Sequence, residues 1–349
     1  MLQELLGIRT PARAEGAASA AATDPLPAET AMVPVPTLKR KRPRIGLALG
    51  GGAARGWAHI GAIRALERAG YAPEVVVGTS IGAVVGGCYA AGKLDELEKF
   101  ARSLTKSRVL WLMDFHIGSG LISGDRLKRL LERDIGDLLI EDVSPRFAAV
   151  ATELRTGHEI WLTRGRLVEA LQASYALPGI FDPVRLGGRW LFDGALVNPV
   201  PVTTTRALSA ELVIAVNLNA DLVGRGALIP DHGGGAEPQA EEEMAETIAE
   251  GLFSPVMGAA SRLKRIVRRS AGAPGLATVM VDAFNITQDR IARSRLAGDP
   301  PDIHVKPRLG RVGLFDFHRA EEAITLGEDA MNQCLADLEM TIESLPGGY

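Results

Sequence analysis

Three short segments of the chain carry residue types that acyl-transfer chemistry needs. The first, Gly78-Thr79-Ser80-Ile81-Gly82, fits the pattern G-x-S-x-G, in which a serine nucleophile lies on a sharp turn between a strand and a helix. Glycines flank such a serine because larger residues there would collide with the neighbouring strand and helix. The serine would also lie at a helix N-terminus, where the dipole favours developing negative charge. A five-residue pattern arises by chance, so it predicts a hydrolase only together with further signals.

The second segment, Gly50–Gly56, also lies between an expected strand and an expected helix. Its backbone N–H groups could hold either a phosphate or the oxyanion of an acyl-transfer intermediate. A P-loop needs a Gly-Lys-Ser/Thr ending, whereas this loop ends in Arg55-Gly56-Trp57. The G-x-G-x-x-G spacing is absent too, because no glycine lies three residues after Gly52. We therefore favour the oxyanion over nucleotide binding.

The third segment is Asp193-Gly194-Ala195, directly after the expected strand Arg189–Phe192. Such a dipeptide after a strand is most often a simple turn, but the two other segments make Asp193 a candidate general base for Ser80. An unperturbed aspartate, with a pKa of ~3.9, is a weak base toward a hydroxyl. Burial would raise that pKa toward neutrality, so we expect Asp193 to be buried.

A histidine could instead complete a Ser–Asp–His triad, which in an α/β-hydrolase needs a histidine after the aspartate. His232 falls in an expected insertion, and no loop signature surrounds His304 or His318. His59 lies near the expected site, where we favour a structural or loop-supporting role. We therefore predict a Ser80–Asp193 dyad. The chain has six histidines: His59, His116, His158, His232, His304 and His318.

Alternating strands and helices must position these segments. Strands are expected at Ile45–Leu49 and Val75–Val77, with helices at about 57–69 and 82–91, and this alternation predicts an α/β fold with parallel strands. Further strands are expected at 147–153, 158–163, 184–186, 189–192, 212–217 and 303–306, with Gly187-Gly188 as a two-residue hairpin turn. Further helices are expected within 94–133, including 126–132, and at about 241–269, 277–297 and 318–343.

The composition predicts one main domain after a non-periodic N-terminal segment. Residues 1–41, rich in Ala and Pro with a basic end, are expected to be a disordered lead, and residues 42–349 to form the domain, with the core motifs at 45–217. A Gly/Pro-rich stretch at about 220–240 is expected to be a mobile insertion, followed by C-terminal helices over 241–349. The stretch Glu241–Arg269 is either an interfacial helix or lid, or a packing helix.

The bulk properties exclude several classes of protein. The 349 residues are 46% hydrophobic with a net charge of −3, which gives no reason to expect a nucleic-acid partner. Two cysteines, Cys88 and Cys334, argue against a disulfide framework and for a reducing compartment. We expect no secretory signal, no membrane span, and no metal or other cofactor.

The ordered segments together resemble the patatin-like phospholipase family, in the bacterial branch similar to the catalytic domain of neuropathy target esterase. The resemblance runs from about Ile45 to Val202, includes the block Ser174–Val184, and extends toward the C-terminus. It implies a three-layer α/β fold with a mostly parallel central sheet flanked by helices. It also implies Ser80 as nucleophile and Asp193 as base. The implied oxyanion-hole motif comprises Gly51, Gly52, Ala53 and Arg55, the first three lending N–H groups and Arg55 bracing the loop. The implied supporting positions are Gly50, Gly56, Gly78, Gly82, Gly194 and Ala195.

One residue departs from the family pattern. Ala53 stands where many members have a third glycine, and an alanine is less comfortable at positive φ. The N–H group of Ala53 remains available, so the resemblance to the family holds. The departure bears only on the geometry of the oxyanion hole.

The function implied by the resemblance is serine-dependent hydrolysis of carboxylic esters in phospholipids or lysophospholipids, without a cofactor. It also implies peripheral membrane contact, and we expect a cytoplasmic location at the inner membrane face. A regulatory lipid-binding protein with the same fold and a vestigial dyad is the alternative. Head group, acyl-chain length and oligomeric state stay open at the level of sequence.

Overall fold

A computed structural model describes residues 42–112, 125–178, 180–221 and 276–345. Several expectations lie outside these residues: the N-terminal lead, all but the first two residues of the insertion at 220–240, and the helix at Glu241–Arg269. His116 and His232 also lie outside them.

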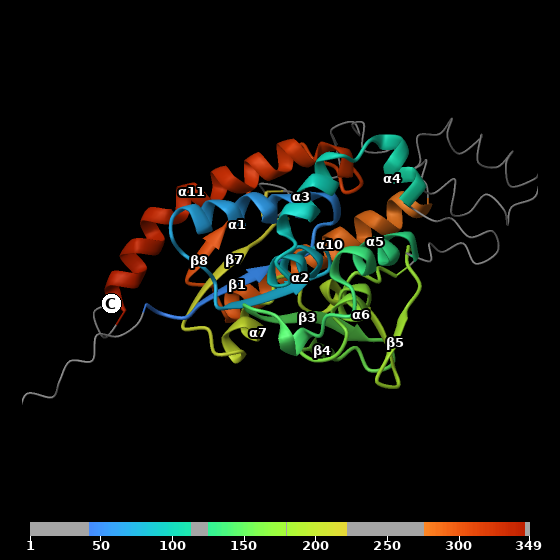
Figure 1. The fold of residues 1–349 in the computed structure, drawn as a ribbon, viewed down its shortest axis with the longest axis horizontal. Helices are drawn as coiled ribbons and strands as arrows, with labels where there is room; N and C mark the ends of the chain where they lie inside the picture. The colour runs from blue at the N-terminus through green and yellow to red at the C-terminus, as the bar shows by residue number, and fades with distance from the viewer. Residues whose placement is uncertain (1–41, 113–124, 179, 222–275, 346–349) are drawn as a thin grey trace, which may run out of the picture. The chain divides into compact units, whose positions relative to one another are not determined.

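Among the described residues, eight strands form one mixed sheet (Figure 1). The strand order is β5-β6-β3-β2-β1-β7-β8, and β4 pairs separately with β3. The run from β3 to β8 is parallel, while β4, β5 and β6 are antiparallel. The strands are β1 (Ile45–Leu49), β2 (Val75–Thr79), β3 (Arg146–Glu153), β4 (Glu159–Leu162), β5 (Val184–Leu186), β6 (Arg189–Asp193), β7 (Leu212–Val216) and β8 (Ile303–Val305).

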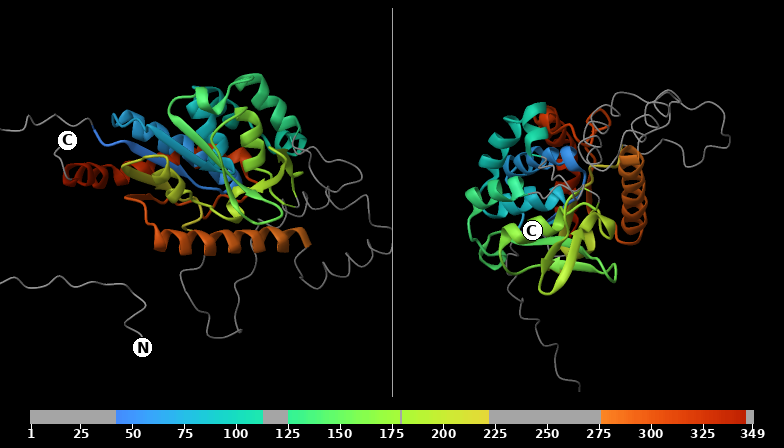
Figure 2. Two further views of the ribbon diagram at one scale, coloured as in Figure 1. Left: turned by 90° about the horizontal axis from the view of Figure 1, so that it is seen from below. Right: turned by 90° about the vertical axis from the view of Figure 1, so that its right-hand side faces the viewer.

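Helices cover both faces of this sheet, so the predicted three-layer α/β fold is confirmed (Figures 1 and 2). On one face, α1, α2, α6 and α11 pack against side chains such as Leu47 and Leu49. On the other face, α10 packs through Ala292 near Ala48, and α7 lies beside it. The parallel strands β1, β2 and β7 are buried along their whole length and β3 along nearly all of it, as parallel strands in such folds are. The helices are α1 (Ala58–Arg68), α2 (Ile81–Ala90), α3 (Leu94–Arg102), α4 (Lys106–Leu112), α5 (Asp125–Ile135), α6 (Leu167–Ser174), α7 (Val202–Ala207), α10 (Leu276–Gly298) and α11 (Ala320–Ser344).

Most expected elements are confirmed, with differences at their ends. The hairpin turn at Gly187-Gly188 is present, with both residues at positive φ (55° and 81°), which suits glycine. The expected helix at 57–69 begins only at Ala58, because Ala53–Trp57 forms a separate 3-10 turn, η1. The last helix likewise begins at Ala320, after the 3-10 turn η5 (Phe317–Arg319). No helix among the described residues is both long and apolar enough to cross a membrane.

Two glycines allow α1 and α11 to pack closely. A Cβ atom on Gly61 of α1 would lie 1.9 Å from the carbonyl oxygen of Ile324, and one on Gly327 of α11 would lie 1.9 Å from that of Ala58. Neither contact is possible, so any side chain here would push the helices apart.

We therefore expect Gly61→Ala to lower the free energy of unfolding by about 3 kcal/mol, the upper range for overpacking in a core. Urea denaturation measures this loss. Gly298→Ala is the matched control, because a Cβ atom there meets nothing within 4 Å and we expect no loss of stability. An unchanged unfolding midpoint for Gly61→Ala would show that the helices are further apart than described.

Candidate active site

Ser80 lies on a strained turn between β2 and α2. Its backbone angles, φ 57° and ψ −125°, are ones that a non-glycine residue rarely adopts, at a cost of about 1–3 kcal/mol. Close packing of α2 on the sheet imposes this turn: a Cβ atom on Gly82 would lie 2.2 Å from the carbonyl oxygen of Leu49. One on Gly78 would lie 2.3 Å from that of Gly82. The two glycines of the predicted elbow are thus required by backbone approach.

The side chain of Ser80 is hydrogen-bonded to that of Asp193. The Ser80 hydroxyl donates to Asp193 Oδ2 at 2.6 Å, and the Ala195 N–H donates to Asp193 Oδ1 at 2.8 Å. Burial of the carboxyl group, which is 1% exposed, raises the pKa of Asp193 to about 7, against the opposing effect of these two hydrogen bonds. A carboxyl group with a pKa near neutrality is far better suited to accept a proton than an ordinary aspartate.

Pairing of β6 with β3 determines where Asp193 lies. Asp193 is opposite Ala151 in the antiparallel register, and the Thr152 hydroxyl donates to the Asp193 carbonyl oxygen at 2.8 Å. A Cβ atom on Gly194 would lie 2.2 Å from the carbonyl oxygen of Val150. The Asp-Gly pair is therefore more than a turn signal, since the chain leaves β6 too close to β3 for a larger residue.

The glycine-rich loop offers fewer donors than the sequence predicts. The Gly51 N–H donates to the Pro199 carbonyl oxygen at 2.9 Å, and the Arg55 N–H donates to that of Gly52 at 3.1 Å. The Gly51 N–H group, predicted as an oxyanion donor, is thus already bonded within the protein in this structure. Arg55 is likewise no donor to the site. Within the described part of the chain, no hydrogen bond is recorded for the N–H groups of Gly52 and Ala53, and both residues line the pocket that contains Ser80.

Ala53 adopts a positive φ, the conformation that is less comfortable for alanine than for glycine. Its φ is 49°, in the left-handed region that glycine occupies at little cost. The alanine therefore carries backbone strain that the family's usual glycine would avoid, while its N–H group stays available.

Two buried side chains brace the glycine-rich loop. Arg55 Nε donates to the Val312 carbonyl oxygen at 2.7 Å, as the resemblance implies for a bracing residue. His59 Nε2 lies 2.7 Å from the Gly50 carbonyl oxygen, and burial lowers the pKa of His59 to about 4. The neutral ring thus supports the loop. Among the described residues, no histidine is hydrogen-bonded to Ser80 or Asp193.

Some residues that shape the site carry no local sequence signal. Ser174 Oγ accepts a hydrogen bond from the Ser80 N–H at 2.9 Å and donates one to the Val150 carbonyl oxygen at 2.6 Å. The Asn198 carbonyl oxygen accepts one from the Thr79 hydroxyl at 2.8 Å. Both belong to stretches that match the family, but only the fold brings them to Ser80. The supporting positions Gly50, Gly56 and Ala195 are all buried around this site.

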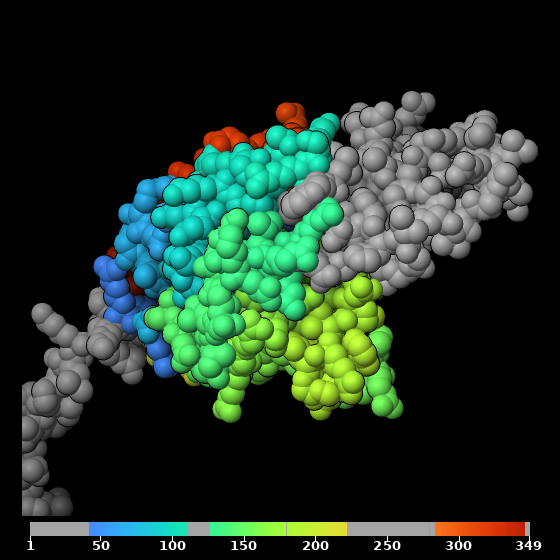
Figure 3. Space-filling model, turned by 45° about the vertical axis from the view of Figure 1, so that its right-hand side comes forward, coloured from blue at the N-terminus to red at the C-terminus, as the bar shows by residue number. Residues whose placement is uncertain are grey.

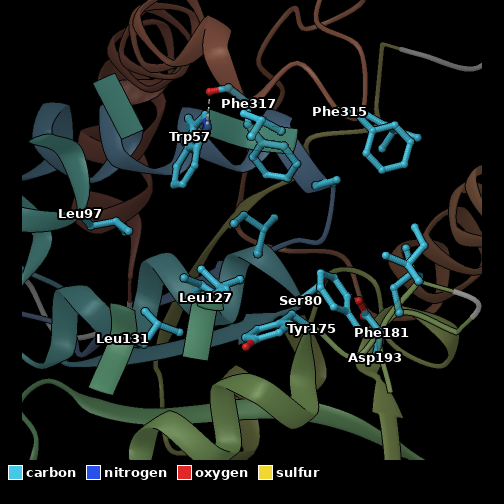
Figure 4. Close-up of a pocket in the computed structure, with 18 of the residues that line it drawn as sticks. Trp57, Ser80, Leu97, Leu127, Leu131, Tyr175, Phe181, Asp193, Phe315 and Phe317 are labelled. Carbon is cyan, nitrogen blue, oxygen red and sulfur yellow. Dashed lines mark hydrogen bonds between the residues drawn. The ribbon is translucent and has the colours of Figure 1, made fainter. Parts of the chain in front are cut away.

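A largely apolar cavity of about 340 Å³ begins at Ser80 and Asp193 (Figure 4). Tyr175 and Phe181 contact each other edge-to-face near the two polar residues, with ring centroids 5.5 Å apart. Trp57 and Phe317 form a similar pair on another wall. The fold and the site together define an α/β protein whose serine lies on a hydrolase-type elbow, beside a buried carboxyl group and an apolar pocket.

Comparisons with known proteins place the chain within this class. Residues 47–206 match the family model described as patatin-like phospholipase. An uncharacterized NTE family protein of Mycobacterium tuberculosis is 33% identical over 88% of this chain and 97% of its own length. The chain belongs to the patatin-like phospholipase family, in its NTE branch, which supports lipid hydrolase activity in general.

Two more distant similarities extend the comparison. The lysophospholipase nte1 of Emericella nidulans is 31% identical over 50% of this chain and 12% of its own length. The crystal structure of VipD from Legionella pneumophila aligns with a TM-score of 0.40 at 14% identity, over 85% of this chain and 67% of that one.

Proposed function

We propose that this protein is a serine-dependent lipid acyl hydrolase that cleaves carboxylic esters of phospholipids or lysophospholipids. Ser80 is the nucleophile, Asp193 the general base, and the N–H groups of Gly52 and Ala53 form the oxyanion hole. One observation carries the proposal: the 2.6 Å hydrogen bond from the Ser80 hydroxyl to a buried Asp193, within an apolar pocket. The name of the fungal relative, a lysophospholipase, supports the same class of substrate.

The first half of the reaction forms an acyl-enzyme. Ser80 Oγ attacks the ester carbonyl carbon as its proton moves to Asp193 Oδ2, and the carbonyl oxygen becomes an oxyanion held by the Gly52 and Ala53 N–H groups. Collapse of this intermediate breaks the bond to the alcohol. The leaving alkoxide takes the proton from Asp193, which returns to its ionised form.

The second half releases the fatty acid. A water molecule gives a proton to Asp193 and attacks the acyl carbon, and the oxyanion forms in the same place. Collapse breaks the bond to Ser80 Oγ, which takes the proton back. The cycle consumes one water and needs no cofactor, so every other group that it uses belongs to the protein or the ester.

Peripheral contact with a membrane, at its inner face, is part of the proposal, because phospholipid esters lie in an interface. The stretch Glu241–Arg269, with its apolar stripe and basic end, would make such contact if it is the interfacial helix rather than the packing helix. The division into a lead of 41 residues and one acyl hydrolase domain also remains a prediction.

A fluorophosphonate probe tests the proposal directly. We expect it to form a covalent adduct on Ser80, located by peptide mass spectrometry, and to abolish ester hydrolysis in proportion to labelling. If the folded protein binds lipid but neither reacts with the probe nor hydrolyses any ester, the vestigial-dyad alternative is correct instead.

A further inference from the structure

We propose that the cavity measures the length of the acyl chain and favours medium chains of about ten carbons. This inference rests on the proposed function, because it takes Ser80 as the point where the acyl group is attached. The length is set by the face of α2 that follows Ser80 and by a charged group at the far end of the cavity.

The distance along the cavity follows from the spacing of its lining residues. Val84 and Cys88 line it and are four residues apart, so they lie on one face of α2, and Ser80 lines it directly before that helix. With a rise of about 1.5 Å per residue, Cys88 is about 12 Å beyond Ser80. An extended alkyl chain advances about 1.25 Å per carbon, given C–C bonds of about 1.5 Å. An acyl group on Ser80 therefore reaches Cys88 with about its tenth carbon.

Apolar side chains from α3 and α5 enclose this path. Leu97 and Phe100 of α3 and Leu127 and Leu131 of α5 line the cavity together with α2. The close-up shows Ser80 and Asp193 toward one side of the cavity, with Leu97 and Leu131 on the opposite side (Figure 4). Both α3 and α5 reach the surface on one face of the domain, as its outer wall (Figure 3).

The lining becomes charged where the path passes Cys88. The Lys93 N–H donates to the Cys88 carbonyl oxygen, and Lys93 Nζ pairs with Glu96 Oε1 at 3.4 Å. Asp134 of α5 lines the same end and is hydrogen-bonded to Arg133, which lowers the pKa of Asp134 and keeps it ionised. The side chains of Lys93 and Glu96 are 38% and 44% exposed, so water reaches this end. Methylene groups beyond Cys88 would meet hydrated charges, so burial no longer favours a longer chain.

The test is the chain-length profile of hydrolysis. Monoacyl glycerophosphocholines of 4 to 18 carbons, at a fixed mole fraction in non-ionic detergent micelles, serve as substrates. We expect kcat/KM to rise by up to about fourfold per methylene as far as about ten carbons, and to level off or fall beyond. A rise that continues to 16 carbons overturns the proposal.

Two substitutions move the limit in opposite directions. Val84→Phe places a ring about 6 Å beyond Ser80, so we expect the preferred length to fall to about five carbons. Glu96→Leu removes a charge from the far end and is expected to move the limit to longer chains. Glu98→Leu is the matched control, since Glu98 lies on the same helix but does not line the cavity. If circular dichroism shows that Val84→Phe does not fold, the comparison of Glu96→Leu with Glu98→Leu still tests the chain-length limit.

A binding measurement separates this proposal from the catalytic one. Isothermal titration of Ser80→Ala with free fatty acids of 6 to 16 carbons is expected to show the same limit without turnover. If binding shows the chain-length limit but the unsubstituted protein hydrolyses no ester, the proposed function is wrong and the chain-length proposal stands. If the protein hydrolyses esters of all chain lengths equally, the proposed function stands and the chain-length proposal is wrong.

Discussion

Replacement of Ser80 by alanine is expected to lower kcat/KM for ester hydrolysis by about 10⁴-fold or more, the usual loss when the nucleophile of a hydrolytic site is removed. The reason is that Ser80 Oγ is the atom that attacks the ester in the proposed mechanism, a role that its short hydrogen bond to Asp193 supports. A β-carbon remains at this position, so the packing of the elbow is retained. Turnover of a short acyl ester measures the loss, with circular dichroism to show that the fold persists.

The matched control for this change is Ser103→Ala. Ser103 is an exposed serine whose hydroxyl donates to the Phe100 carbonyl oxygen, and it does not line the cavity. We expect full activity in this variant. Retained turnover in purified Ser80→Ala would refute the assignment of the nucleophile, whatever the behaviour of the control.

Asp193→Asn is expected to slow hydrolysis strongly and to stabilise the protein at the same time. The asparagine Oδ1 can still accept the hydrogen bond from the Ala195 N–H, but the side chain can no longer take a proton from Ser80. General-base catalysis contributes about 10²–10⁴ in rate, so a loss of that size is expected. In the unsubstituted protein, kcat/KM should rise with pH through about 7 as Asp193 ionises.

The stabilisation follows from the same pKa. Because burial raises the pKa of Asp193 from 3.8 to about 7, the folded protein holds a proton that the unfolded chain releases near pH 4. Stability therefore falls as pH rises between about 4 and 7, and the full penalty, on the order of 4 kcal/mol, is present above pH 7. Asparagine carries no charge and escapes this penalty. Asp193→Asn should melt at a higher temperature at pH 8 and at nearly the same temperature at pH 4.

Thermal unfolding across this pH range measures the difference. Asp137→Asn removes an exposed carboxylate that pairs with Arg166 and should show no comparable gain at pH 8. A flat pH–rate profile between pH 5 and 9, or a loss of stability in Asp193→Asn at pH 8, would mean that Asp193 is not a neutral buried carboxyl group near pH 6.

The site combines several features that lower the stability of the fold. Ser80 and Ala53 both hold positive φ values, and the buried carboxyl group of Asp193 has no positively charged partner among the described residues. Each feature costs stability, and each has a role in the proposed mechanism: the first presents the hydroxyl, the second directs an N–H group, and the third supplies a base. The rest of the sheet must compensate for these costs.

The order of strands and helices and the positions of Ser80 and Asp193 were determined by the sequence itself. Local chemistry explains the hairpin, because Gly187 and Gly188 both hold positive φ values that suit glycine. The G-x-S-x-G pattern marks the elbow in the sequence, although the close approach of Leu49 that requires Gly82 is a tertiary contact. The hairpin depends on backbone angles and on neighbours within a few residues. The same holds for the short apolar runs and the turn residues that predict the strands.

Only the tertiary structure decided which loop N–H groups remain free and what shape the cavity at Ser80 has. The Gly51 N–H is bonded to the Pro199 carbonyl oxygen, 148 positions along the chain, and Ser174 reaches Ser80 across 94 positions. The cavity likewise combines α2 with α3 and α5, and its charged end combines Lys93 with Asp134. Such contacts depend on how parallel strands bring distant segments to one edge of the sheet. No local pattern predicts these contacts, because a turn or helix forms from nearby residues in the same way whichever distant segment packs against it.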